Sequence, residues 1–126
     1  MKLWSLLMIL ILSLSCNSTD PNIKMQRKAL IETVNESYTP SLGTALYSED
    51  IDQLKNGVSA IFKSNCDKDK KCWIKKVSFL DLDKKPMYEY DNKNFDPTKK
   101  NITSSSSNLK AEGKEYAILK IEYALD

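Results

Sequence analysis

The clearest β pattern in this chain is Trp73-Ile74-Lys75-Lys76-Val77-Ser78-Phe79-Leu80-Asp81-Leu82-Asp83-Lys84-Lys85-Pro86-Met87-Tyr88-Glu89-Tyr90. Over 73–80 the pattern predicts a strand with its odd-numbered positions on one face and its even-numbered positions on the other. Aspartates and lysines fill most of 81–85, which is typical of a turn. Residues 86–90 are expected to return as a second strand, so the run predicts an antiparallel β-hairpin.

Helical periodicity precedes the hairpin. Apolar positions from residue 23 onward recur every three to four residues, which predicts a helix over 23–37. Pro40 disfavours the helical conformation at the residue before it, so we expect the helix to kink or break there, followed by a short turn over 42–46. A second, amphipathic helix is expected to begin at residue 48 or 49 and to end near residue 63, with Asp50 in its first turn.

The chain after the hairpin is less regular. Residues 91–108 are polar and contain Pro97 and four consecutive serines, so we expect a long loop or a weak pair of strands. Residues 116–125 are rich in aromatic and aliphatic side chains and predict a strong final strand. Two helices followed by an antiparallel sheet give an α+β fold, with the N-terminal helices packed on the sheet in a single domain.

The composition argues against several functions. The 126 residues include 19 lysines and arginines and 17 aspartates and glutamates, interspersed along the chain. Nucleic-acid binding needs a clustered basic surface, so we expect no such partner. The sequence has no histidine, the commonest general base and metal ligand, and no glycine-rich phosphate loop. We therefore expect no enzymatic activity, no metal and no cofactor.

The N-terminus predicts export. It reads Met1-Lys2-Leu3-Trp4-Ser5-Leu6-Leu7-Met8-Ile9-Leu10-Ile11-Leu12-Ser13-Leu14-Ser15-Cys16, a lysine and an apolar run followed by small residues and a cysteine. This order is typical of a secretory signal peptide, and the apolar run is shorter than the roughly 20 residues of a membrane-spanning helix. It resembles the signal of bacterial lipoproteins, with a loose cleavage box similar to that of spirochaete lipoproteins. The resemblance implies that 1–15 are removed and that lipidated Cys16 and the tether 16–22 hold a domain, 23–126, on a membrane outside the cytoplasm.

The cysteines leave alternatives open. The N-terminal run also fits an ordinary cleaved signal or an uncleaved anchor, with Cys16 an unmodified thiol. If Cys16 carries lipid, Cys66 and Cys72 are left as a pair, and an oxidising compartment favours a structural disulfide between them. The alternative is a metal or redox pair, but no histidine or further cysteine completes a zinc site and the spacing is not that of redox dithiols.

Three stretches resemble extracytoplasmic PAS-like (Cache-type) sensor domains. They are Tyr38-Thr39-Pro40-Ser41-Leu42-Gly43-Thr44-Ala45-Leu46-Tyr47-Ser48-Glu49-Asp50-Ile51-Asp52-Gln53-Leu54, the hairpin over 73–89, and Ile118-Leu119-Lys120-Ile121-Glu122-Tyr123-Ala124-Leu125-Asp126. The resemblance implies a ligand pocket between the sheet and the segments that cover it. The chain departs from the family at Lys84, where the hairpin turn would carry a glycine. Such sensors continue into a second membrane helix and a signalling domain, so a separate membrane signalling partner is expected here.

Four hairpin residues are candidates for ligand binding. Lys76, Ser78, Tyr88 and Tyr90 are expected to project from the strands where a small polar ligand would sit. In the alternative interpretation the tyrosines are half-buried packing residues and Lys76 is exposed to solvent, because aromatic side chains on sheets ordinarily pack.

Three functions are compatible with these features. The first is a lipid-anchored, sensor-like module that binds a small ligand or a membrane signalling partner. The second is a surface lipoprotein that acts as an adhesin or an inhibitor through protein–protein contacts. The third is a small structural factor of the cell envelope.

Overall fold

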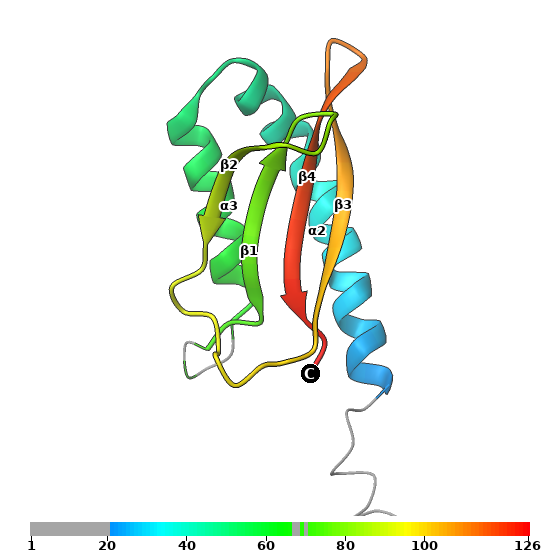
Figure 1. Cartoon of the computed structure of the whole chain (residues 1–126), viewed down its shortest axis with the longest axis vertical. Coiled ribbons are helices and arrows are strands. Elements are labelled where there is room, and N and C mark those ends of the chain that lie inside the picture. Colours follow the sequence, from blue (N-terminus) through cyan, green and yellow to red (C-terminus); the bar gives the residue numbers. More distant parts are fainter. Residues whose placement is uncertain (1–20, 67–68, 70) are drawn as a thin grey trace, which may run out of the picture.

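The computed structural model describes residues 21–66, 69 and 71–126. Cys16 and the expected signal over 1–15 lie outside the described residues, and the expected tether is described only at 21–22, which already belong to a helix. Two helices precede four strands (Figure 1): α2 (Pro21–Tyr47), α3 (Ile51–Ser64), β1 (Ile74–Leu80), β2 (Pro86–Asp91), β3 (Ile102–Ala111) and β4 (Lys114–Ala124).

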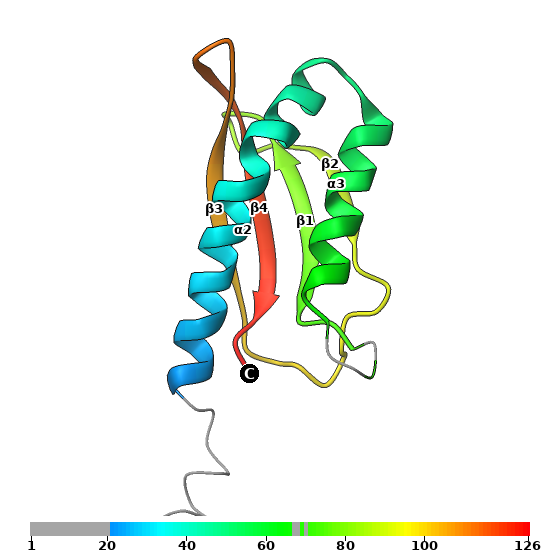
Figure 2. The same ribbon diagram turned by 180° about the vertical axis from the view of Figure 1, so that it is seen from behind.

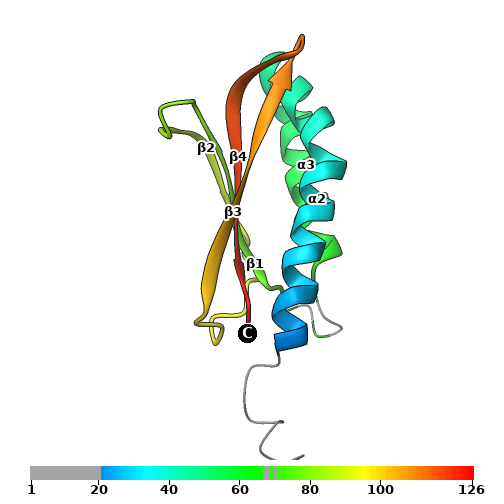
Figure 3. The same cartoon turned by 90° about the vertical axis from the view of Figure 1, so that its right-hand side faces the viewer.

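The four strands form one antiparallel sheet in the order β2-β1-β4-β3. Both helices lie on the same face of this sheet, and no described helix covers the opposite face, here called the open face (Figure 3). From the helix side, α2 runs along β3 and β4, while α3 lies beside β1 and β2 (Figure 2). The predicted α+β class, with N-terminal helices packed on an antiparallel sheet, is confirmed.

The two central strands supply the middle of the core. Val77 and Phe79 of β1 pair with Ile121 and Leu119 of β4, and all four side chains are fully buried. The helices contribute the apolar side chains that cover them: Ile31, Leu42, Ala45, Leu46, Leu54, Val58 and Ile61. Because each square ångström of apolar surface removed from water stabilises the fold by about 25 cal/mol, this contact fixes both helices on one face.

The first residues of β1 depart from strict alternation. The register of β1 against β4 shifts between Ile74 and Lys76, and Lys75 has no partner residue on β4. Ile74 is fully buried in the same core as Val77. The prediction that Ile74 shares a face with Lys76 and Ser78 is therefore wrong, because one extra residue in a bulge reverses the phase of the strand that precedes it.

Of the kink or break predicted at Pro40, the break does not occur. A single helix runs through Pro40, which is exposed. A proline inside a helix costs about 3 kcal/mol, because it removes one hydrogen bond and crowds the preceding turn. Beyond it, however, Leu42, Ala45 and Leu46 are each at most 5 % exposed. Burial of three apolar side chains offsets that cost, so packing against the sheet overrides the local signal.

The polar segment after the hairpin divides in two. Residues 91–101 are largely irregular beyond the end of β2, as expected, whereas 102–111 form β3 and pair with β4 along their length. The four serines lie in this strand, and the hydroxyl of Ser105 accepts a hydrogen bond from Asn35 Nδ2 at 3.0 Å. Serine has no strong strand preference, so β4 and α2 supply the pairing that the sequence pattern of β3 lacks.

The hairpin turn is built on Asp81. Its Oδ1 accepts the backbone N–H groups of Asp83 and Lys85, each at 2.9 Å. This Asx-type turn confirms the turn predicted over 81–85. Lys84 adopts a φ of 66°, a left-handed conformation that costs a non-glycine residue about 1 kcal/mol. In the PAS-like sensor domains that this hairpin resembles, a glycine would occupy this position.

Two glycines allow α2 to approach its neighbours closely. A Cβ atom on Gly43 would lie 2.8 Å from the carbonyl oxygen of Lys110 in β3. A Cβ atom on Gly57 of α3 would lie 2.6 Å from Leu42 Cδ2. The first neighbour is backbone, whereas the second is the end of a flexible side chain.

We expect Gly43→Ala to lower the free energy of unfolding by about 1–3 kcal/mol, because overpacking against backbone forces α2 away from β3. Gly57→Ala is the matched comparison. It should cost less, since Leu42 can change rotamer and alanine favours a helix over glycine by about 1 kcal/mol. Urea denaturation measures both variants, and an equal or larger loss for Gly57→Ala contradicts this account.

Candidate functional site

The four candidate ligand-binding residues lie on two faces of the sheet. Tyr88 and Tyr90 pair with core residues of β1, so their side chains face the helices. Lys76 and Ser78 occupy the alternate positions of β1 and face the open side. The structure therefore brings the two tyrosines together and Lys76 together with Ser78, but it does not assemble all four around one site.

On the open face, Lys76 and Ser78 already have neighbours. Lys76 Nζ lies 3.2 Å from Glu89 Oε2. The hydrogen bond with Glu89 raises the pKa of Lys76 above its ordinary value, and it outweighs the opposing effect of desolvation. Ser78 is only 4 % exposed. On this face the ammonium of Lys76 is therefore paired and Ser78 is almost completely covered.

On the helix-covered face, Tyr90 borders a groove between α3 and the edge strand β2. The groove has a volume of about 570 Å³, within the range of roughly 300–1,000 Å³ that small-molecule sites occupy. One wall is formed by residues 89–94. The other comes from α3: Lys55, Val58, Ser59, Phe62 and Lys63.

The floor of the groove is apolar. Val58 is 2 % exposed, and Phe62 and Tyr90 are partly buried against the core. The Tyr90 ring meets Phe79 edge to face, with 6.1 Å between ring centroids. Burial, followed by the proximity of Tyr88, raises the pKa of Tyr90. The phenol therefore stays protonated at neutral pH and keeps a hydroxyl that can donate a hydrogen bond.

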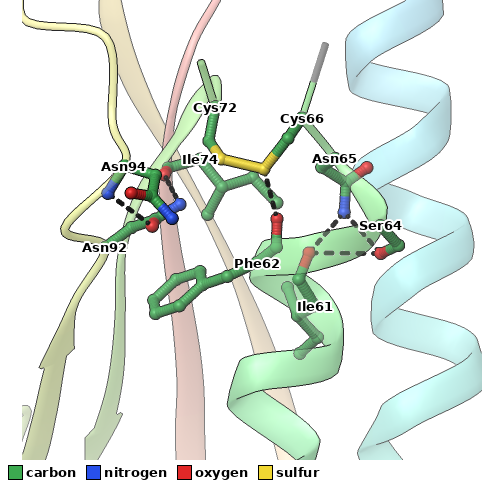
Figure 4. Close-up of a disulfide and its surroundings, with 9 residues drawn as sticks. All are labelled: Ile61, Phe62, Ser64, Asn65, Cys66, Cys72, Ile74, Asn92 and Asn94. Carbon is green, nitrogen blue, oxygen red and sulfur yellow. Dashed lines mark hydrogen bonds between the residues drawn. A yellow bond between two sulfur atoms is a disulfide. The ribbon is translucent and has the colours of Figure 1, made fainter. Parts of the chain in front are cut away.

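The expected disulfide between Cys66 and Cys72 is present and lies next to Phe62 and Asn94, which line the groove (Figure 4). It joins the end of α3 to the residues that lead into β1. The backbone N–H of Cys72 donates to the carbonyl of Asn94 at 2.9 Å, and the N–H of Asp96 donates to the carbonyl of Cys72 at 3.0 Å. Cys72 therefore ties the helical wall of the groove to the wall formed by 89–94.

Sequence reasoning identifies a residue in only one wall of this groove. Tyr90 was a candidate, but the α3 residues were not. Ser59 follows Lys55 by four residues, and Phe62 and Lys63 follow Ser59 by three and four residues, so this spacing predicts a shared helical face. That signal does not say what the face lies against. The position of α3 beside β2 turns the face into the wall of a groove.

Comparisons of the chain with protein-family models, curated proteins and solved structures find no match. Neither of the two described helices has both the length and the apolar content needed to cross a membrane. The described part of the chain is thus a disulfide-bonded α+β domain with a groove at one edge of its sheet.

We expect loss of the disulfide, in the double variant Cys66→Ser/Cys72→Ser, to lower the free energy of unfolding by about 2–3 kcal/mol, because the unfolded chain regains the freedom of the closed loop. Amide exchange should also become faster over 92–96. Urea denaturation and hydrogen exchange measure the two effects. A reductant should destabilise the unmodified protein and leave the stability of the double variant unchanged. If the double variant and the unmodified protein unfold at the same urea concentration, the disulfide has no structural role.

Proposed function

We propose that this chain is a lipid-anchored extracytoplasmic domain that binds a small molecule in the groove between α3 and β2, as a sensor-like module. The groove is the observation that supports binding. Its volume of about 570 Å³, its apolar floor and its polar rim have the general form of a small-ligand site. The position between the sheet and a covering helix agrees with the position that the resemblance to PAS-like domains implies.

The proposed anchor is supported by the N-terminal sequence and by the disulfide. A signal that ends at Cys16 fits lipidation, and a Cys66–Cys72 bond suits an oxidising compartment. Two or more acyl chains on one protein give stable membrane attachment. Pro21 follows Cys16 by five residues, so the backbone between them spans at most about 18 Å. The first turn of α2 and the start of β1 lie at the same end of the domain (Figure 1), so the disulfide end of the groove is the end nearer the anchor.

The anchor is tested by expressing the chain in a bacterial host. Mass spectrometry of the mature protein should show a new N-terminus at Cys16 that carries acyl chains, and the protein should sediment with membranes. Cys16→Ser should abolish both acylation and sedimentation, whereas Cys66→Ser should keep both. A native protein that retains Met1 and does not sediment with membranes contradicts the proposal.

A second candidate function, protein binding as an adhesin or inhibitor, is favoured by the edge strand β3. Residues 102–109 contain no charge, proline or glycine, and no other described segment lies beyond their outer edge (Figure 3). Exposed edge strands usually carry charged residues or proline, which prevent pairing with another chain, as β2 does with Pro86, Glu89 and Asp91. An unprotected edge can accept a strand from another protein.

The two candidates are separated by filling the groove. We expect some members of a charge-diverse fragment library to shift backbone NMR signals of α3 and 89–94, and Ser59→Trp to abolish these shifts because its ring occupies the groove. Gln53→Trp, on the opposite side of α3, is the control and should leave them intact. If no member of the library shifts the signals of the groove, ligand binding there is rejected. If a protein partner shifts only the signals of β3, the second candidate function is supported.

A further inference from the structure

We infer that the groove takes a small organic anion with an apolar body, such as an aromatic or aliphatic carboxylate. This inference rests on the proposed function and specifies its ligand class. It follows from how charge is distributed between the two faces of the sheet and from the chemistry of the groove floor.

Three lysines stand on the rim of the groove. Lys55 and Lys63 come from α3, and Lys93 comes from the turn that follows β2. The two helical lysines are eight positions apart, a rise of about 12 Å along the helix, and both line the groove. All three are exposed, and none forms an ion pair with a carboxylate among the described residues.

The two acidic residues of the opposite wall do not neutralise these lysines. Glu89 and Asp91 alternate with Tyr90 along β2, so their side chains leave the sheet on the open face. Glu89 forms its ion pair with Lys76 there, and Asp91 is the register partner of the same lysine. The acidic side chains are therefore directed to one face and the rim lysines stand on the other.

The groove interior adds an uncharged donor and apolar surface. In the described part of the molecule no group accepts a hydrogen bond from the Tyr90 hydroxyl, which remains available to a ligand oxygen. Val58 and Phe62 offer apolar contact beneath it. A bound anion would meet ammonium groups at the rim and the phenol below, whereas a bound cation would be repelled by the same ammonium groups.

The test is a titration of the purified protein with three probes of one shape: 4-phenylbutyrate, 4-phenylbutanol and 4-phenylbutylamine, followed by backbone NMR. We expect the carboxylate to shift signals of α3 and 89–94 and to bind about tenfold more tightly than the alcohol, a difference of about 1.4 kcal/mol. The amine should bind more weakly than the alcohol. Raising the salt concentration should weaken binding of the carboxylate alone, because the rim charges are exposed.

Variants locate the effect. Lys55→Gln and Lys63→Gln should each weaken carboxylate binding about two- to fivefold, as expected for loss of one solvated charge. Tyr90→Phe should weaken carboxylate and alcohol alike. Lys28→Gln, an exposed lysine on α2, is the control and should change nothing. The backbone NMR spectrum of each variant without ligand serves as the control that the variant is folded.

The outcomes separate the inference from the proposed function. If the alcohol or the amine binds in the groove as tightly as the carboxylate, the ligand class is wrong while ligand binding stands. If Lys28→Gln weakens binding as much as Lys55→Gln, bulk charge explains the preference and the inference falls. If none of the three probes and no member of the fragment library reaches the groove, the proposed function itself is rejected.

Discussion

Burial of one face of β1 and β4 beneath the two helices is the constraint on which the other features of this domain depend. Val77, Phe79, Leu119 and Ile121 are fully buried only because α2 and α3 both lie on this face. Gly43 allows α2 to approach β3 closely. No described helix covers the other face, which carries polar side chains such as Lys76, Ser78 and Glu89. The groove forms beside this packed region, where α3 and the edge strand β2 meet.

The same constraint separates charge across β2. In a strand the side-chain period is two residues, so Tyr88 and Tyr90 on the covered face force Glu89 and Asp91 onto the open face. A shift of the β1–β2 register by one residue would exchange the two sets, placing carboxylates beside the core and tyrosines in solvent. Burial of Val77 and Phe79 against the tyrosines opposes such a shift. The chemistry of the groove is thus determined by the packing of the core.

The parts of the fold that could be predicted are those whose signal is local. The helix α3 has an aspartate at its N-cap, Asp50, whose side chain accepts the N–H of Gln53 at 3.3 Å, and it has a regular apolar face. The hairpin has alternation and a turn built on aspartate. The path of α2 through Pro40 and the existence of β3 depend on distant partners, so no local pattern reports them. For the candidate site, the alternation identified Tyr90, but the wall from α3 depends on how a helix docks on a sheet, which spacing alone does not determine.

The groove is connected to the start of α2 by a continuous set of contacts. Cys72 is hydrogen-bonded to Asn94 in the groove wall, and the guanidinium of Arg27 stacks over the ring of the next residue, Trp73, at 5.1 Å from the ring centroid. Arg27 also donates to the carbonyl of Ala124 at 2.9 Å, and the Trp73 ring meets Tyr123 edge to face. The first turns of α2, the start of β1 and the end of β4 are therefore held together at one end of the domain. Because a covalent bond and a charged side chain bridge these elements, displacement of the groove wall at 92–94 is opposed by the same contacts that hold the start of α2. A domain attached to a membrane through the residues before α2 would thus present its groove from a rigid base.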